Sequence, residues 1–341
     1  MAVRDTRQRP LRSLRLSVTD RCNLRCHYCM PEAEYAWLPK QDLLTFEEIG
    51  HLANLMGAIG VNRIRLTGGE PLLRRDLPRL VASLGERPWL TDLAMTTNGV
   101  LLADAAADLR RAGLRRLTVS LDTLDADRFK ALTRSDGLAD VLAGIDAARH
   151  VGFTELKLDA VIVRGRNDDE LVPLLDFARR LDAEIRFIEY MDVGGATGWQ
   201  PGDVVSRDEV LARLSAHYGP VTALADPDGS APAMRYRLMD GHVFGIIAST
   251  TTPFCRTCDR ARLTADGVLL LCLYAQHGTD LRRPLRAGAS AETLSRLLRA
   301  VWETRADRGA EERIATRERG SFIPLSALKR DAHLEMHTRG G

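Results

Sequence analysis

This sequence has a small net charge and lacks long apolar runs. The 48 lysine and arginine residues nearly balance the 46 aspartate and glutamate residues, so the net charge is only +2. No overall electric field therefore draws nucleic acid or an anionic membrane to the chain. No apolar run approaches the roughly 18 residues that a membrane-spanning helix needs. The N-terminus, MAVRDTRQRP, has no apolar core of the kind found in secretory signals, so we expect a cytoplasmic protein.

Lysine is also rare in this sequence. Arginine supplies almost all of the positive charge, because the only lysines are Lys40, Lys130, Lys157 and Lys329. A single arginine is therefore a weak sign of function in this chain. Lys157 is a stronger one, since it lies in an apolar run of β type, where an ammonium group is costly to bury without an anionic partner.

The six cysteines form two triplets at opposite ends of the chain, and none is left over. The triplets are Cys22-x3-Cys26-x2-Cys29 and Cys255-x2-Cys258-x13-Cys272. Disulfide frameworks are typical of short secreted chains, so disulfides are not the favoured interpretation. A closed tetrahedral metal site needs four ligands, and a cubane iron–sulfur cluster has four irons to hold. Three thiolates therefore leave one coordination position for a group that is not protein.

A structural zinc ion is the alternative interpretation of these triplets. His277 could complete a tetrahedral site with the second triplet, and His27 lies inside the first. The Cys-x3-Cys-x2-Cys spacing of the first triplet is unusual for zinc. The zinc alternative therefore stays open for the second triplet only.

Residues 12–195 alternate between short β-type runs and amphipathic helical stretches. The expected strands are Leu14–Val18, Arg63–Thr67, Leu93–Thr97, Leu117–Leu121, Leu156–Val163 and Ile185–Tyr190. Thr45-x-x-Glu48 forms a capping box, and Ser206-x-x-Glu209 begins a later helix in the same way. Six successive β–α units favour a parallel sheet, because each strand needs a crossover helix to return.

Polar or glycine-rich residues follow nearly every one of these strands. Active sites gather at the carboxyl ends of the strands in parallel barrels, whereas a doubly wound sheet concentrates them at one switch point. We therefore expect an α/β protein: an incomplete (β/α)6 barrel over residues 1–225 and a smaller α+β domain over residues 226–341. In the second part, Asp266-Gly267 predicts a hairpin, and the apolar stripe over residues 294–302 predicts a late helix.

Two motifs resemble those of a known superfamily. The run Cys22-Asn23-Leu24-Arg25-Cys26-His27-Tyr28-Cys29 resembles the signature loop of the radical S-adenosylmethionine (SAM) enzymes, and Gly68-Gly69-Glu70-Pro71 matches their second motif. Further motifs narrow the resemblance to the GTP 3′,8-cyclase family of molybdenum cofactor biosynthesis. They span essentially the whole chain, at residues 14–23, 65–71, 96–99, 254–264 and 340–341.

The resemblance implies two 4Fe–4S clusters, SAM as a cofactor and GTP as the substrate. The first cluster would be held by Cys22, Cys26 and Cys29. The second cluster, whose open iron takes the guanine of GTP, would be held by Cys255, Cys258 and Cys272. The SAM site would be lined by Tyr28, Gly69, Ser120 and Met191. GTP would be held by Arg15, Arg65, Thr96, Lys157, Arg260 and Arg262. Guanidinium forks suit phosphate oxygens.

The family's reaction implies that a 5′-deoxyadenosyl radical takes the ribose 3′ hydrogen of GTP and that the resulting carbon radical attacks C8 of guanine. Reduction then completes (8S)-3′,8-cyclo-7,8-dihydroguanosine 5′-triphosphate. The implied partners are an external electron donor and cyclic pyranopterin monophosphate synthase, which receives the product. Neither nucleic acid nor membrane is expected, and the chain is expected to be a monomer or a homodimer. The Gly340-Gly341 tail is expected to enter the site.

Two alternatives belong to other classes. One is another two-cluster radical SAM enzyme, for example one that modifies a peptide. Such enzymes typically carry more cysteines in the C-terminal part, and this chain has only three there. The other is a binding module built around a structural zinc ion, which leaves the pairing of the cysteine loop with Gly-Gly-Glu-Pro unexplained.

Overall fold

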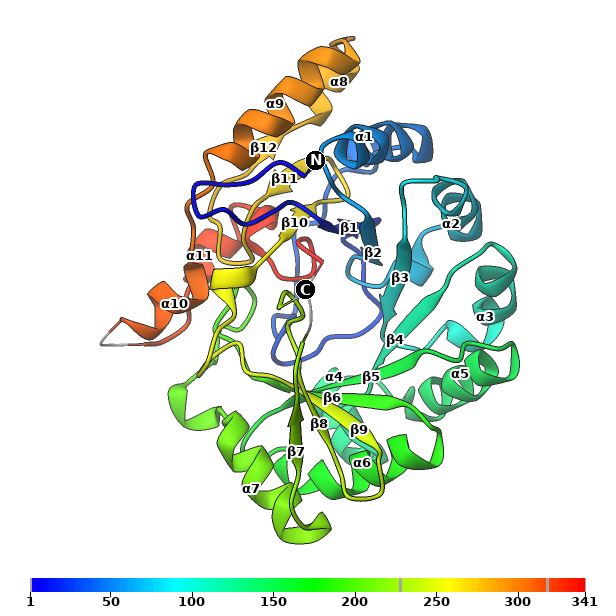
Figure 1. The fold of residues 1–341 in the computed structure, drawn as a ribbon, viewed down its shortest axis with the longest axis vertical. Helices are drawn as coiled ribbons and strands as arrows, with labels where there is room; N and C mark the ends of the chain where they lie inside the picture. Colours follow the sequence, from blue (N-terminus) through cyan, green and yellow to red (C-terminus); the bar gives the residue numbers. More distant parts are fainter. Residues whose placement is uncertain (1, 227–228, 317–318, 341) are drawn as a thin grey trace.

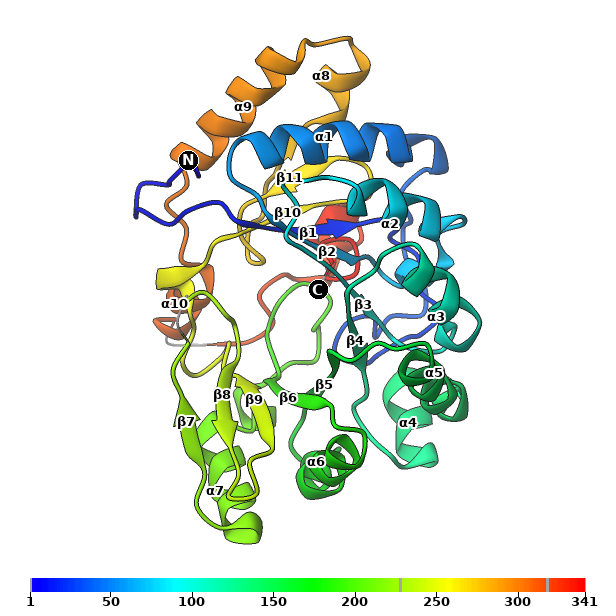
Figure 2. The same ribbon diagram turned by 45° about the vertical axis from the view of Figure 1, so that its right-hand side comes forward.

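One curved β-sheet runs through both parts of the chain (Figure 1). The computed structural model describes residues 1–341 except residues 1, 227–228, 317–318 and 341. Within the described residues, twelve strands form a sheet in the order β12-β11-β10-β1-β2-β3-β4-β5-β6-β9-β8-β7. The sheet bends around a central space, and most of the helices lie outside it (Figures 1 and 2).

The six central strands are parallel and follow one another in chain order. They are β1 (Ser13–Ser17), β2 (Arg63–Thr67), β3 (Asp92–Thr97), β4 (Arg116–Ser120), β5 (Leu156–Ile162) and β6 (Glu184–Glu189). Each begins and ends within one residue of the range expected from the sequence. Buried and partly exposed residues alternate strictly along β5, which shows the period of two that a pleated strand imposes. The predicted parallel sheet is confirmed.

The helices pack mainly on the outer face of this sheet (Figure 1). They are α1 (Phe46–Ala58), α2 (Leu77–Gly85), α3 (Leu102–Arg111), α4 (Ala126–Thr133), α5 (Leu138–His150), α6 (Leu171–Arg180), α7 (Arg207–Tyr218), α8 (Arg282–Arg286), α9 (Ala291–Glu303), α10 (Gly309–Ile314) and α11 (Leu325–Leu328). Short 3-10 turns are η1 (Lys40–Asp42), η2 (Pro71–Leu73), η3 (Asp168–Glu170), η4 (Pro201–Asp203), η5 (Cys255–Thr257) and η6 (Ala332–Leu334). Both predicted capping boxes are present, at the starts of α1 and α7. None of the described helices is long and apolar enough to cross a membrane.

The second part of the chain extends the sheet at both edges. β10 (Arg260–Leu263) adds to β1 in parallel, and β11 (Val268–Leu270) and β12 (Thr279–Asp280) follow it in antiparallel order. At the other edge, β9 (Val243–Ile247) adds to β6 in parallel and is followed by β8 (Met234–Arg237) and β7 (Thr222–Leu224). The predicted hairpin at Asp266-Gly267 joins β10 to β11, and Gly267 has a φ of 89°, a conformation that favours glycine.

The sheet continues across the domain boundary expected near residue 225. That position lies between β7 and β8, which pair with each other, so the sheet is continuous across it. Because β10 lies beside β1 in parallel, the second cysteine triplet lies near the start of β1, whereas the loop that carries the first triplet follows the end of β1. The last described residues then reach the centre of the arc, where they are drawn in red in Figures 1 and 2.

Candidate active site

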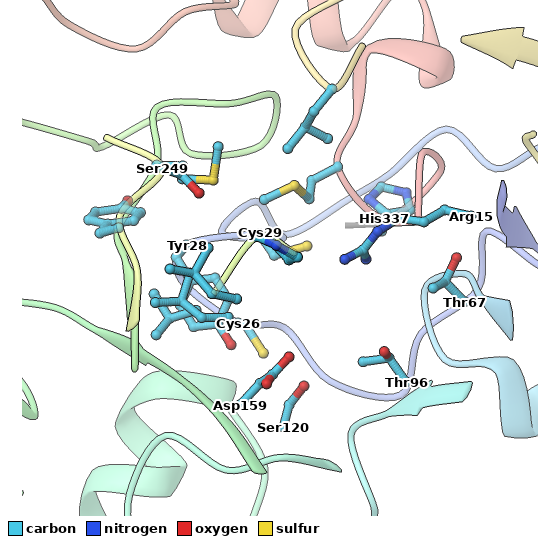
Figure 3. A pocket seen from close by; sticks show the side chains of 18 of the residues that line it. Arg15, Cys26, Tyr28, Cys29, Thr67, Thr96, Ser120, Asp159, Ser249 and His337 are labelled. Carbon is cyan, nitrogen blue, oxygen red and sulfur yellow. The ribbon is translucent and has the colours of Figure 1, made fainter. Parts of the chain in front are cut away.

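A cavity of about 320 Å³ opens at the carboxyl ends of the parallel strands. All six cysteines line it, although the two triplets come from opposite ends of the chain. Figure 3 shows Cys26 and Cys29 on one side, Ser120 and Asp159 below them, and Arg15, Thr67 and Thr96 on the other side. The cavity therefore combines soft sulfur donors at two places with polar side chains between them.

The loop after β1 presents the first triplet. Its backbone is anchored on the end of α4, because the Arg25 N–H donates to the Thr133 carbonyl at 2.8 Å and the His27 N–H donates to the Leu132 carbonyl at 3.0 Å. Burial raises the pKa of the Cys22 thiol to about 11 and also raises the pKa of Cys26 and Cys29. These thiols lose their protons readily only when a cationic group binds them, which is what metal ligation provides.

Gly68 and Gly69, after β2, allow a close approach between two backbone segments. A Cβ on Gly69 would lie 2.3 Å from the Arg21 carbonyl oxygen, and one on Gly68 would lie 2.4 Å from the Thr19 carbonyl oxygen. The glycines therefore let the second motif pack against the cysteine loop, besides lining the cavity. Glu70 is buried and accepts from the N–H groups of Leu72 and Asn98, so it ties the ends of β2 and β3 together.

The second triplet lies at the edge formed by β10 and β11. Cys255 begins the η5 turn and Cys258 follows it, just before β10, and Cys272 follows β11. Burial raises the pKa of Cys272 to about 11. Burial would also raise the pKa of Cys258, but the positive charges of Arg260 and Arg305 outweigh it and lower that pKa to about 7.

Neither triplet forms a closed metal site among the described residues. Among the described residues, no three His, Cys, Asp or Glu side chains are grouped so as to hold a metal ion. His277, the fourth ligand in the zinc alternative, is exposed, and His27 is absent from the cavity wall. The fit to iron–sulfur clusters rests on the donor chemistry: all six cysteines are free thiols, and three soft sulfur donors line the cavity at each place.

Three arginines on neighbouring strands concentrate positive charge in the cavity. Arg15 on β1 lies opposite Arg262 on β10 in the parallel register, and Arg260 precedes Arg262 by two residues. Burial, and then the nearby Arg262, lower the pKa of Arg15. Burial and then Arg260 lower the pKa of Arg262 to about 10. Like charges held this close favour a bound polyanion, because an anion relieves both burial and repulsion.

The C-terminal tail enters this cluster of arginines. The Gly340 carbonyl accepts from Arg262 Nη1 at 2.7 Å and from Arg15 Nη1 at 3.5 Å. The tail is anchored upstream by His333, whose ring contacts Asp266 at 2.8 Å and Asp331 at 2.9 Å. The expected entry of the tail into the site is therefore supported as far as Gly340, while Gly341 lies outside the described residues.

Fourteen of the sixteen predicted site residues line the cavity. They are the six cysteines together with Tyr28, Gly69, Ser120, Met191, Arg15, Thr96, Arg260 and Arg262. Arg65 and Lys157 are not part of its wall. Arg65 Nη1 donates to the hydroxyls of Thr96 and Thr118 at 3.0 Å each. Lys157 Nζ donates to Glu184 Oε1 at 3.2 Å, which supplies the anionic partner that its burial demands.

Three further residues of the wall carry polar groups that the sequence interpretation did not assign. Asp122 accepts from the Tyr28 hydroxyl at 2.7 Å, and burial raises its pKa to about 6. Asp159 lies opposite Ser120 in the β4–β5 register. Both could have been found from the sequence, since Asp122 follows β4 and Asp159 is two residues from Lys157. His337 comes from the C-terminal segment, and no periodicity or motif marks it.

Comparison with known proteins identifies the family of this chain. Residues 16–178 match the Radical SAM superfamily, and residues 183–311 match the family described as Molybdenum Cofactor Synthesis C. GTP 3′,8-cyclase 3 of Mycobacterium bovis is 57% identical over 99% of this chain and 90% of that protein. The chain belongs to the GTP 3′,8-cyclase family. A second member, GTP 3′,8-cyclase 1 of Mycobacterium tuberculosis, is 55% identical over 99% of the chain and 95% of its own length.

Solved structures support the same fold at much lower identity. Streptococcus suis SuiB has a TM-score of 0.60 at 15% identity, covering 91% of this chain and 68% of SuiB. At this identity the likeness concerns the fold alone. Within the GTP 3′,8-cyclase family, the two matched regions divide the site between them: the first triplet lies in the Radical SAM region, and the second in the Molybdenum Cofactor Synthesis C region.

Proposed function

We propose that this chain converts GTP to (8S)-3′,8-cyclo-7,8-dihydroguanosine 5′-triphosphate, the first step of molybdenum cofactor biosynthesis. One observation carries the proposal: two cysteine triplets and a cluster of arginines line a single cavity. Relatives that are 55–57% identical over 99% of the chain are GTP 3′,8-cyclases, which supports the same activity here.

The two triplets would divide the cofactors between them. Cys22, Cys26 and Cys29 would hold a 4Fe–4S cluster that binds SAM beside Tyr28 and Ser120. The second triplet would hold a second 4Fe–4S cluster whose open iron takes guanine. When bound, the first cluster and SAM would supply radical chemistry for removal of the 3′ hydrogen of the ribose.

The protein's own part is to bind and orient the nucleotide. Arg15, Arg260 and Arg262 would take the triphosphate at the β1–β10 end of the cavity, where burial and mutual repulsion favour an anion. With guanine held by the second triplet, the ribose between these two anchors would be fixed. Ring closure between C3′ and C8 needs such a restricted near-attack geometry. The Tyr28–Asp122 hydrogen bond would keep the wall beside the first triplet in place.

Several finer points are part of the same proposal. The six parallel strands and their outer helices support an incomplete (β/α)6 barrel, with the cluster-binding part added at its edges. Arg65 and Lys157 would reach GTP only if they leave Thr96, Thr118 and Glu184. The chain would act in the cytoplasm, take electrons from an external donor and pass its product to cyclic pyranopterin monophosphate synthase.

Anaerobic incubation of the iron-loaded chain with SAM, GTP and a reductant tests the activity. We expect 5′-deoxyadenosine and the cyclised nucleotide to appear in equal amounts. A variant with Cys255, Cys258 and Cys272 changed to alanine should keep about four irons per chain and lose the cyclised product. Absence of both products from the fully loaded wild-type chain would refute the proposal.

The same preparation separates the alternatives. Roughly eight irons per chain fit two cubane clusters, whereas one zinc ion with little iron would favour the binding module. A peptide-modifying enzyme would cleave SAM without consuming GTP. The release of 5′-deoxyadenosine should therefore depend on GTP, and GDP, which lacks one phosphate for the arginines, should support it less well.

A further inference from the structure

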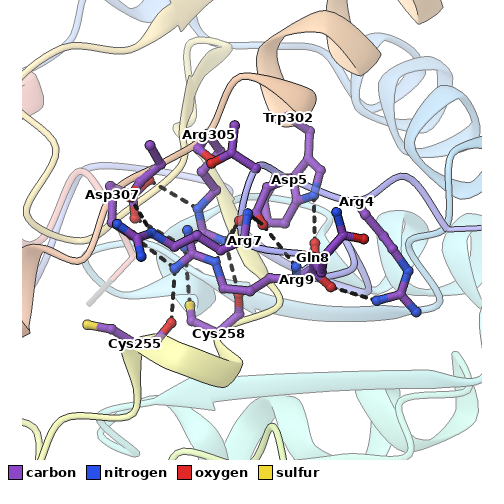
Figure 4. A network of polar contacts seen from close by, with 12 residues as sticks. Arg4, Asp5, Arg7, Gln8, Arg9, Cys255, Cys258, Trp302, Arg305 and Asp307 are labelled. Carbon is purple, nitrogen blue, oxygen red and sulfur yellow. Dashed lines mark hydrogen bonds and ion pairs between the residues drawn. The ribbon is translucent and has the colours of Figure 1, made fainter.

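A buried polar network contacts Cys255 and Cys258 of the second triplet (Figure 4). It joins the N-terminal segment, residues 4–9, to the end of α9 and the segment that follows it, residues 302–307. Arg9 Nη1 donates to the Cys255 carbonyl at 2.9 Å, and Arg9 Nε donates to Asp5 Oδ2 at 2.6 Å. Trp302 Nε1 donates to the Arg9 carbonyl at 3.2 Å.

Arg305 is the member of this network that contacts a sulfur atom. Its Nη2 lies 3.4 Å from Cys258 Sγ, and its Nη1 donates to the Cys258 carbonyl at 2.9 Å. The side chain is 1% exposed, and its guanidinium carbon lies 4.5 Å from the centre of the Trp302 ring. Asp307 accepts from Nε at 3.1 Å and from Nη2 at 3.2 Å. Several contacts therefore hold Arg305 with one N–H directed at the sulfur of a proposed cluster ligand.

Cys258 differs from Cys22 of the first triplet in the charge of the groups that donate to its sulfur. Cys22 Sγ accepts from the Leu24 N–H at 3.4 Å and from Asn98 Nδ2 at 3.9 Å, and both donors are neutral. Among the described hydrogen bonds, Cys258 is the cysteine whose sulfur accepts from a cationic side chain. The second triplet therefore differs electrostatically from the first.

We propose that Arg305 is a positioning residue that orients Cys258 and raises the reduction potential of the cluster held by the second triplet. The inference rests on the proposed function, because it requires a cluster at this triplet. A cationic donor to a ligating sulfur stabilises the more negative, reduced form of a cluster. The step concerned is the uptake of one electron from an external reductant, in which no bond forms or breaks.

The network explains why arginine is needed at this position. Arg305 must satisfy Asp307, the Cys258 carbonyl and Cys258 Sγ at once, and its planar fork has donors in three directions. A lysine would bring the charge but could not make all of these contacts in the same geometry. Arg9 provides a matched comparison, because it is equally buried and holds the Cys255 carbonyl but donates to no described sulfur.

The test uses the full chain with Cys22, Cys26 and Cys29 changed to alanine, so that any cluster signal belongs to the second triplet. Arg305→Gln, Arg305→Lys and Arg9→Gln are compared by iron content and by redox titration followed by electron paramagnetic resonance. We expect Arg305→Gln to lower the midpoint potential, Arg305→Lys to lower it less, and Arg9→Gln to leave it unchanged. An unchanged potential in Arg305→Gln, or an equal fall in Arg9→Gln, would overturn the inference.

Iron analysis makes the two possible failures distinguishable. Zinc in place of iron at the second triplet would overturn both the two-cluster proposal and the role of Arg305. A full cluster whose midpoint potential does not depend on Arg305 would overturn the role of Arg305 and leave the two-cluster proposal standing. If Arg305→Gln loses iron that Arg9→Gln retains, the loss supports the orienting role, and the potential of Arg305→Lys then decides the electrostatic one.

Discussion

Arg262→Met should separate nucleotide binding from stability. Arg262 is a buried arginine on β10 whose nearest described partners are carbonyl oxygens of the C-terminal tail. Methionine keeps the length and packing of the side chain but removes the charge and its donors. The substitution therefore takes away the proposed phosphate contact while leaving the core of the sheet filled.

The expected change in the free energy of unfolding is the difference between two opposing contributions. Burial and Arg260 lower the pKa of Arg262 from 12.5 to about 10, so holding the charge costs the nucleotide-free protein about 3 kcal/mol. The two bonds to the tail carbonyls, at 2.7 and 3.2 Å, return roughly 1.5 kcal/mol each, the lower end of the range for hydrogen bonds that involve a charged group. These terms nearly cancel, so the free energy of unfolding should change by less than about 1 kcal/mol. Loss of a charged hydrogen bond to phosphate should weaken GTP binding by about 10- to 150-fold.

The assay is anaerobic measurement of the Kd for GTP, alongside denaturant unfolding of the same preparations. Arg283→Met, at an exposed arginine on α8, is the matched control and should alter neither quantity. Removing one partner of a buried ion pair typically costs 3–5 kcal/mol of stability. A loss of that size in Arg262→Met with an unchanged Kd would refute the reasoning, because Arg262 would then be a structural cation.

Three other outcomes are expected. Gly69→Ala should destabilise the fold by about 1–3 kcal/mol and lower the iron content of the first triplet, because the new Cβ would lie 2.3 Å from a carbonyl oxygen. The control is Gly198→Ala, whose new Cβ would have no atom within 4 Å and which should be neutral in the same unfolding and iron assays. Deletion of residues 340–341 should abolish cyclisation with iron content intact, and unchanged turnover would contradict the role of the tail. Hydrogen bonding to the neighbouring Asp266 raises the pKa of His333, so its contribution to stability should be complete below about pH 6.5 and fall as the pH rises through the raised value. His333→Gln should flatten this dependence in thermal unfolding, and an identical pH profile would count against it.

Much of the fold follows from local sequence patterns. Strand positions are predicted to within one residue because alternating apolar residues impose a period of two, and a capping box is made within four consecutive residues. The proposed cluster ligands are equally local, since each cysteine triplet is marked by its own spacing. The sequence assigns the buried charge of Lys157 to GTP, whereas in the structure Lys157 donates to Glu184, which lies on another strand and is marked by no local pattern.

Local sequence patterns are thus enough to predict the helices and strands, the two cysteine triplets and the family's motifs. These depend on contacts between residues close together in the chain. Tertiary packing places β10 beside β1, which brings Arg260 and Arg262 next to Arg15, and it places both triplets in the wall of one cavity. It also decided that Gly69 faces the cysteine loop and that Arg305 reaches Cys258. Such pairings join distant segments, and they are selected by how whole surfaces fit together rather than by any local pattern.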